Sequence, residues 1–225
     1  MRSLAGLAAL ALLALLAPAC SSEPAASSDL DTNDEEIVAS RCASYAGRID
    51  AKVAAARELL THLDSPYAQT LAAELDSGRI HALPMCKMTH VEFAELQKGT
   101  DLTALGKTPE EQYASLRRAD APAMKSVHAQ IYGFQWENRI YLSTGMSDSR
   151  TLETIAHEVQ HVLRRAHLRN FEDQRVTCVE EIAAAEAELL VRRDTLTDAE
   201  RSKVHASVLD LYELDKIRAG TCTYR

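Results

Sequence analysis

The chain has 225 residues, and its 33 acidic residues outnumber its 25 Lys and Arg residues, which gives a formal net charge of −8. An acidic chain of this kind is not expected to bind nucleic acid, or to hold anionic lipids through a basic patch. Only three Phe and one Trp are present, so Leu, Ala, Val and Ile must fill most of the core. That composition favours helices.

The first segment of the chain, residues 1–19, is typical of an export signal. Arg2 gives it a positive start, and the Leu/Ala-rich run over residues 4–16 is too short to span a membrane as a helix. The small residues before Cys20 resemble the end of a bacterial lipoprotein signal. This resemblance implies that Cys20 carries the lipid and, with Ser21 beside it, that the protein is anchored in the outer membrane facing the periplasm. An ordinary cleaved secretory signal is the alternative, and it also places the protein outside the cytoplasm.

Residues 20–33 are rich in Ser, Ala and Asp and show no apolar periodicity. We therefore predict a disordered tether between the lipid and the folded part of the chain. Residues 34–225 are expected to form a single, mainly helical domain whose length supports a substantial core.

Besides Cys20, four cysteines are available for disulfides: Cys42, Cys86, Cys178 and Cys222. In an oxidising compartment four cysteines form two disulfides, and three pairings are possible. We favour Cys42–Cys222 together with Cys86–Cys178, because this pairing would tie the terminal helices together. A cysteine zinc site is not expected, since no two cysteines lie at close ligand spacing.

The N-terminal half of the predicted domain reads as a series of helices. Capping sequences built from Asn, Ser or Thr, followed by Pro or by an acid three residues later, mark the starts of the longer ones. The predicted helices cover residues 34–63, 66–77, 91–97 and 109–119. Residues 79–107 are otherwise ambiguous, with a loop after residue 97.

The period of the apolar residues then changes from helical to alternating. Two β-rich runs, Ala129–Trp136 and Arg139–Ser143, predict a β-hairpin, which is the only clear strand material in the sequence. We interpret the second run as an edge strand. A turn follows, and Asp148 or Ser149 is expected to cap the next helix.

This next helix contains the sequence His-Glu-Val-Gln-His at residues 157–161. At about 100° per residue, His157 and His161 lie one turn apart on the same face. Both rings can then bind one zinc ion, while Glu158 can hold the attacking water. An apolar stripe at helical spacing would bury the helix and fix the histidines. The stripe consists of Leu152, Ile155, Ala156, Val159, Leu163 and Ala166.

Two helices are predicted after this motif, over residues 177–194 and 197–219, and we expect them to form an antiparallel helical hairpin. A catalytic zinc ion needs a third protein ligand. His167 stands at the spacing used by metzincins, but that family has Gly where this chain has Arg164. Without the turn that Gly permits, His167 would point away from His157.

The helix after the motif offers three other candidates for the third ligand, Glu180, Glu181 and Glu186. This helix and the His-Glu-x-x-His sequence before it resemble those of the gluzincins, the thermolysin-like zinc proteases. The resemblance covers about residues 129–195. The resemblance favours Glu181, which lies at the thermolysin-like separation, whereas Glu180 lies at a neighbouring separation used by other members. Glu186 competes on helical geometry, because it sits at the centre of an apolar stripe. The chain departs from thermolysin at Ala185, where that family has an acid that supports a ligand histidine; Glu188 or Glu186 is expected to replace it.

The resemblance implies a zincin-like fold of the α+β class, mainly α, with a small β-hairpin or sheet before the motif helix and a helical hairpin after it. It also implies a zinc metallopeptidase, a hydrolase of peptide or protein substrates, with Zn²⁺ held by His157, His161 and Glu181 and with Glu158 as the catalytic base. The edge strand would bind an extended peptide by strand addition. Candidate oxyanion donors are Tyr212, His205 and Tyr224. Two alternatives remain open: a zinc-binding but catalytically silent envelope lipoprotein or binding module, and a helical structural lipoprotein with a coincidental motif.

Overall fold

The computed structural model describes residues 29–99, 102–118, 132–164 and 174–211. These residues form seven α-helices, two short 3₁₀ helices and a three-stranded sheet. The helices are α1 (Asp29–Leu60), α2 (Pro66–Asp76), α3 (His90–Gly99), α4 (Pro109–Arg118), α5 (Asp148–Leu163), α6 (Gln174–Leu190) and α7 (Asp198–Leu211). The strands are β1 (His81–Pro84), β2 (Gly133–Trp136) and β3 (Arg139–Leu142), and the 3₁₀ helices are η1 (Met85–Lys87) and η2 (Thr103–Leu105). The prediction of a mainly helical fold with a small sheet before the motif helix is confirmed.

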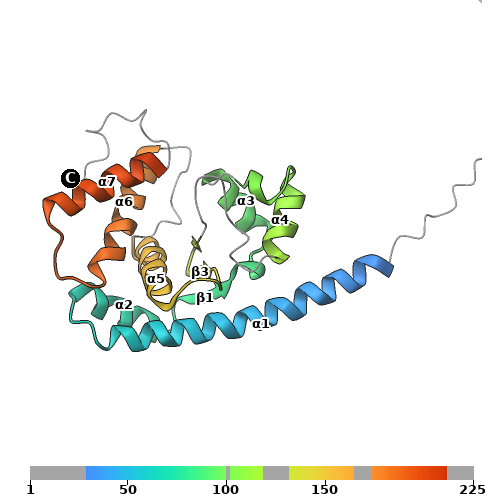
Figure 1. Cartoon of the computed structure of the whole chain (residues 1–225), viewed down its shortest axis with the longest axis horizontal. Helices are drawn as coiled ribbons and strands as arrows, with labels where there is room; N and C mark the ends of the chain where they lie inside the picture. Colours follow the sequence, from blue (N-terminus) through green and yellow to red (C-terminus); the bar gives the residue numbers. More distant parts are fainter. Residues whose placement is uncertain (1–28, 100–101, 119–131, 165–173, 212–225) are drawn as a thin grey trace, which may run out of the picture.

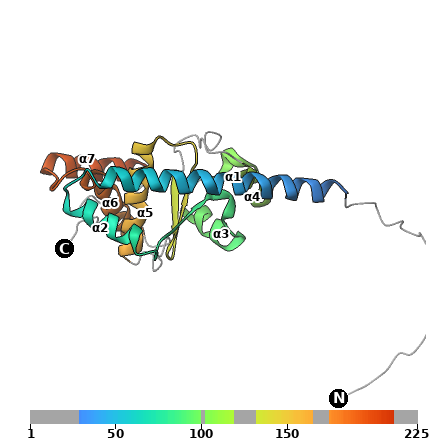
Figure 2. The same cartoon turned by 90° about the horizontal axis from the view of Figure 1, so that it is seen from below.

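Helix α1 runs along most of the length of the described structure (Figures 1 and 2). It begins at Asp29, upstream of the start predicted at Asn33, so residues 29–33 of the predicted tether are helical. A capping sequence permits a helix to start but does not prevent an earlier start, and this accounts for the difference. Among the described helices, none combines the length and the apolar character that a membrane span requires. The signal segment 1–19 and Cys20 lie outside the described residues.

Helix α2 fixes the backbones of two other helices. Ser65 caps α2 by accepting a hydrogen bond from the Ala68 amide at 3.0 Å, and its hydroxyl also donates to the Val191 carbonyl just after α6, at 3.1 Å. Tyr67, in the first turn of α2, donates a hydrogen bond from its hydroxyl to the Ala156 carbonyl of α5 at 2.8 Å. The predicted start at Ser65-Pro66 is therefore confirmed, and it also sets the position of α5 relative to α6.

The strand order is β1-β3-β2, with β2 antiparallel to β3 and β1 parallel to it. The predicted hairpin is confirmed, and Glu137 in its two-residue turn adopts a left-handed φ of 53°. One expectation is wrong, because β3 is the central strand rather than an edge. Strand β1 pairs with its other side and lies in the stretch that the sequence left ambiguous. It is only four residues long and ends in Pro84, so it carries too little alternation to be recognised.

The two faces of the sheet contact different helices. Along β3, Ile140 and Leu142 join the core formed with α1, α2 and α5, whereas Tyr141 between them joins the core formed with α3 and α4. This alternation follows from the two-residue period of a strand. Helices α6 and α7 share a separate buried cluster of Cys178, Ile182 and Val208. They lie at one end of the molecule and α3 and α4 at the other, with α5 and the sheet between them (Figures 1 and 2).

The disulfide prediction is wrong. Cys42 of α1 is bonded to Cys86 of η1, with an S–S distance of 2.09 Å and a Cα–Cα distance of 5.8 Å. Both predicted pairs are thereby excluded. Cys178 is also disulfide-bonded, and Cys222 lies outside the described residues. The prediction failed because it assumed that the terminal helices meet, whereas α1 passes beside β1 and brings Cys42 to the residues that follow this strand.

A buried ion pair joins α3 to the sheet. The Glu92 carboxylate is 1% exposed and accepts hydrogen bonds from the Thr89 amide, the Thr89 hydroxyl and the Tyr141 hydroxyl, each at 2.7 Å. The Arg139 guanidinium lies 3.0 Å from it. Burial by itself raises the pKa of Glu92, but these hydrogen bonds and the charge of Arg139 outweigh it and hold the pKa below its usual value.

Replacing Glu92 by Gln is expected to lower the free energy of unfolding at pH 7 by about 2 kcal/mol, because the Gln amide cannot satisfy the same four donors. A carboxyl group with a lowered folded-state pKa stabilises the protein above its unfolded pKa of about 4.3 and loses that contribution as the pH falls through the folded value. Denaturant unfolding at several pH values should therefore show the gap between wild type and Glu92→Gln closing in acid. A gap independent of pH between 7 and 2 would contradict this account of Glu92.

Candidate metal centre

Helix α5 carries the two motif histidines and is fixed by its buried side. Ser147 caps it by accepting a hydrogen bond from the Arg150 amide at 3.2 Å, so the predicted caps Asp148 and Ser149 are wrong by one or two residues. The predicted apolar stripe is fully buried at four of its positions, Leu152, Ile155, Ala156 and Val159. It ends there, because Leu163 is 38% exposed and Ala166 lies outside the described residues.

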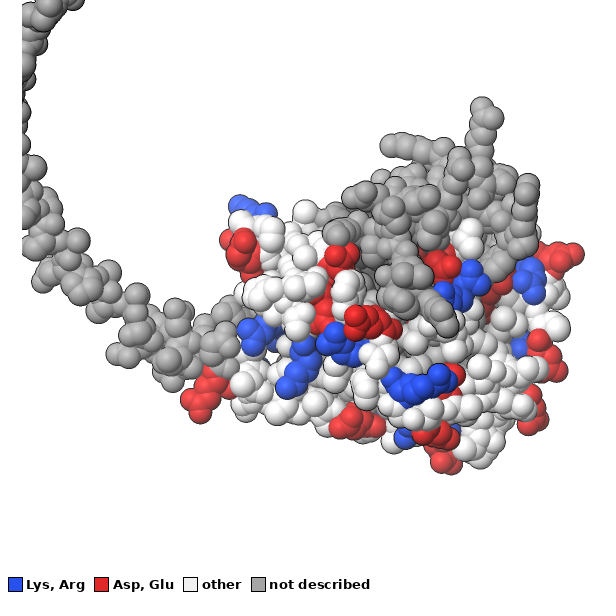
Figure 3. Space-filling view, turned by 180° about the vertical axis from the view of Figure 1, so that it is seen from behind, with Lys and Arg blue, Asp and Glu red and all other residues white. Residues whose placement is uncertain are grey.

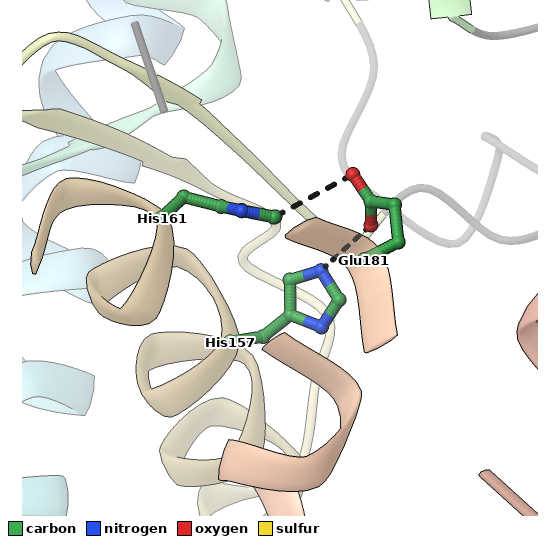
Figure 4. A group of neighbouring side chains, drawn as sticks. All are labelled: His157, His161 and Glu181. Atoms are coloured by element: carbon green, nitrogen blue, oxygen red, sulfur yellow. Dashed lines mark ion pairs between the residues drawn. The ribbon is translucent and has the colours of Figure 1, made fainter. Parts of the chain in front are cut away.

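His157, His161 and Glu181 come together between α5 and α6 (Figure 4). One ligand atom from each side chain lies within 4.8 Å of the others. His157 Nε2 is 3.3 Å from one Glu181 carboxylate oxygen, and His161 Nε2 is 3.6 Å from the other. The two rings are nearly perpendicular, with an interplanar angle of 79°. His161 and Glu181 are buried and His157 is half-buried, so the three groups face each other largely away from solvent.

The other two candidate glutamates of α6 point elsewhere. Glu180 makes two hydrogen bonds to the Arg164 guanidinium, at 2.9 and 3.0 Å. Glu186 pairs with Arg201 of α7 at 3.1 Å, and His205 lies 3.7 Å from it on the same helix. Ile182, one turn before Glu186, is buried in the cluster that α6 shares with α7. His205, considered above as an oxyanion donor, pairs with Glu186 instead, and Tyr212, Tyr224 and His167 lie outside the described residues.

Glu188 contacts the other nitrogen of the His157 ring. Its Oε1 lies 2.8 Å from His157 Nδ1, and its Oε2 lies 3.1 Å from Arg150 Nη1. Burial by itself lowers the pKa of His157, but the hydrogen bonds to Glu181 and Glu188 and the charges of Glu158 and Glu181 raise it well above its usual value. In the absence of a metal, the ring therefore holds a proton at neutral pH, which a metal ion must displace in order to bind.

Glu158 is buried on the side of α5 that faces β2. A Cβ atom added at Gly133 would lie 2.6 Å from Glu158 Oε1 and 2.7 Å from Thr154 Cγ2, so only glycine lets the strand approach α5 this closely. Gly133 was not predicted to belong to the site. The signal for it was an isolated glycine within a β-rich run, a pattern that often marks the close approach of a backbone to another group.

The donor set fits a metal ion. Two imidazole nitrogens and one carboxylate oxygen are the ligands of many catalytic zinc sites, and here they converge from two helices within a short distance of one another. Comparisons with protein-family models, with curated proteins and with solved structures found no match to this chain. Any assignment of function must therefore rest on the geometry of this site.

Proposed function

We propose that this protein is a zinc-dependent peptidase with a zincin-like arrangement of the gluzincin type, acting outside the cytoplasm on peptide or protein substrates. The observation that carries the proposal is the meeting of Glu181 from α6 with both motif histidines of α5. The position of Glu158 supports it, because this carboxylate lies on the same helix and directly against β2. The export signal read in residues 1–20 supports a lipid-anchored location in the cell envelope.

His157, His161 and Glu181 would hold the metal. A bound zinc ion lowers the pKa of a coordinated water towards neutrality and polarises the carbonyl of the scissile peptide bond. Glu158 accepts one proton of the attacking water on its carboxylate and passes it to the nitrogen of the leaving amine. Burial keeps Glu158 out of bulk water, and its contact with Gly133 restricts where its oxygens lie.

The peptide substrate is proposed to bind along the edge of β2 that faces away from β3. Hydrogen-bonded and non-hydrogen-bonded pairs alternate in an antiparallel ladder. The Ser143 amide donates to the Tyr132 carbonyl at 3.0 Å, so the next residue, Gly133, and then Gln135 direct their backbone groups away from β3. Within the described part of the chain, no strand pairs with this edge. An extended peptide can add to it and present its carbonyl beside Glu158.

Charged side chains of both signs lie on the described surface. On the face shown in Figure 3, several basic side chains lie near one another across the middle, with acidic side chains beside them.

The proposed function is tested with the purified protein, an unfolded protein substrate such as casein, and a zinc chelator. We expect about one zinc ion per chain, hydrolysis that stops when the metal is removed, and recovery when zinc is restored. Stoichiometric zinc without hydrolysis of a broad peptide library would instead support the catalytically silent envelope protein. The absence of stoichiometric zinc would leave a structural protein with a coincidental motif.

Replacing Gly133 by Ala is expected to reduce the rate of hydrolysis by about tenfold to a hundredfold, because the added methyl must displace the Glu158 carboxylate by a sizeable fraction of an ångström. Zinc affinity should stay unchanged. The atoms that the added Cβ would meet belong to Glu158 and Thr154, and neither residue is a proposed metal ligand. Gly47→Ala on α1 is the matched control, since a Cβ there meets nothing within 4 Å. Equal rates for the two variants would exclude a catalytic constraint at Gly133.

A further inference from the structure

We infer that Glu188 is a positioning residue, which holds the His157 ring so that the ring binds metal through Nε2. The role rests on the proposed zinc site. Thermolysin-like enzymes place the supporting acid four residues after the ligand glutamate, and this chain has Ala185 there. In this structure, Glu188 is the residue whose carboxylate contacts the second ring nitrogen of His157.

The two carboxylate oxygens of Glu188 have different partners. Oε1 lies 2.8 Å from His157 Nδ1, a distance typical of a strong hydrogen bond. In the neutral form of the ring that binds metal, Nδ1–H donates this hydrogen bond to Glu188, so the lone pair lies on Nε2, the nitrogen that is 3.3 Å from Glu181. The contact therefore selects both the tautomer and the orientation in which His157 can share a metal with Glu181 and His161.

The helical spacing explains why Glu188 can reach His157. Glu188 follows Glu181 by two turns on α6, and His157 follows Arg150 by two turns on α5, so each pair shares one face of its helix. Where α5 packs against α6, His157 meets Glu181 and Arg150 meets Glu188, at 3.1 Å. The long Glu188 side chain then spans the space between the two contacts and touches Arg150 and His157 together.

Arg150 extends this support to the proposed substrate strand. Its guanidinium pairs with Glu153 at 3.2 Å as well as with Glu188, and it lies 4.5 Å from the centre of the Tyr132 ring. Tyr132 directly precedes Gly133, the residue against Glu158. Glu188 and Arg150 thus connect the metal ligands on α5 and α6 to the start of β2. The Arg150–Glu188 ion pair therefore lies where α5, α6 and β2 meet.

The test compares Glu188→Ala with Glu180→Ala, a variant on the same helix with the same change of charge, whose carboxylate pairs with Arg164 and not with a histidine. Zinc affinity is measured by competition with a chromogenic chelator, and the site geometry by the visible absorption of the protein loaded with Co²⁺. We expect Glu188→Ala to bind zinc about 10- to 100-fold more weakly and to shift the Co²⁺ bands, while Glu180→Ala matches wild type. Glu188→Gln keeps an oxygen acceptor for Nδ1 and should recover most of the affinity, which a general loss of folding would not allow.

The outcomes separate this role from the proposed function. If wild type binds zinc and hydrolyses peptides but Glu188→Ala has the affinity and Co²⁺ spectrum of Glu180→Ala, the positioning role is wrong and the peptidase proposal stands. If Glu188→Gln is as impaired as Glu188→Ala although both fold, the hydrogen bond to Nδ1 is not what matters, and the role is likewise excluded. If wild type itself binds no zinc, the proposed function fails and the role fails with it.

Discussion

Replacing Glu158 by Gln is expected to reduce peptide hydrolysis by about 10²- to 10⁴-fold while leaving zinc bound at wild-type stoichiometry. The amide has nearly the shape of the carboxylate, so it should occupy the same buried position against Gly133. It cannot accept the proton of the attacking water, however, and it cannot deliver a proton to the leaving amine. The loss should therefore fall on kcat, with little change in KM.

The measurement for Glu158→Gln is a steady-state assay on a peptide with a defined cleavage site, together with metal analysis of the same sample. The control is Glu180→Gln on α6, whose carboxylate pairs with Arg164 and contacts neither histidine. Glu180→Gln should stay close to wild type. Unchanged hydrolysis by Glu158→Gln with zinc bound would show that Glu158 is not the base, and the mechanism would be wrong.

Replacing Glu181 by Ala is expected to weaken zinc binding by more than a hundredfold, because the loss of a direct ligand should exceed the 10- to 100-fold cost of losing an outer partner. Zinc binding also stabilises the folded protein, by about 2.7 kcal/mol when the free metal is at 100 times its Kd. Thermal unfolding with and without zinc should therefore show a rise in Tm for wild type that Glu181→Ala lacks at the same zinc concentration.

Glu180→Ala is the matched control for Glu181, since it removes the adjacent carboxylate of α6, which pairs with Arg164. Glu186→Ala is less suitable, because it leaves Arg201 without its buried partner and is expected to destabilise the contact between α6 and α7. If Glu180→Ala abolishes the zinc-dependent rise in Tm and Glu181→Ala preserves it, the ligand assignment is reversed.

The elements with strong local signals could be predicted from the sequence. The hairpin formed where two β-rich runs flank a two-residue turn, and α5 formed where an apolar stripe repeats at helical spacing. Capping predicted the start of α2 at Ser65 because Pro66 follows it. The start of α1 was misplaced, since an acid-rich stretch is compatible with a helix on either side of a capping sequence.

Features that depend on contacts between distant residues could not be predicted. Cys42 pairs with Cys86 because α1 passes beside β1, and neither the path of α1 nor the existence of β1 has a local signature. The central position of β3 follows from the same unrecognised strand. Consequently, the substrate edge had to be reassigned from β3 to β2.

The choice among the glutamates of α6 shows both kinds of reasoning. Spacing from the motif favoured Glu181, and the structure places this residue beside both histidines. The apolar stripe required Glu186 to be either a ligand or paired, and its carboxylate is paired with Arg201 of α7. Periodicity identifies the buried face of a helix but not the element that covers it.

The most direct test of the central claim is the structure of the zinc-loaded protein, determined by crystallography with anomalous scattering at the zinc edge. We predict one zinc ion with His157 Nε2, His161 Nε2 and a Glu181 carboxylate oxygen each about 2.0–2.2 Å from it. A zinc ion bound elsewhere, or one held by the two histidines with Glu181 turned away, would contradict the site on which the proposed peptidase activity depends.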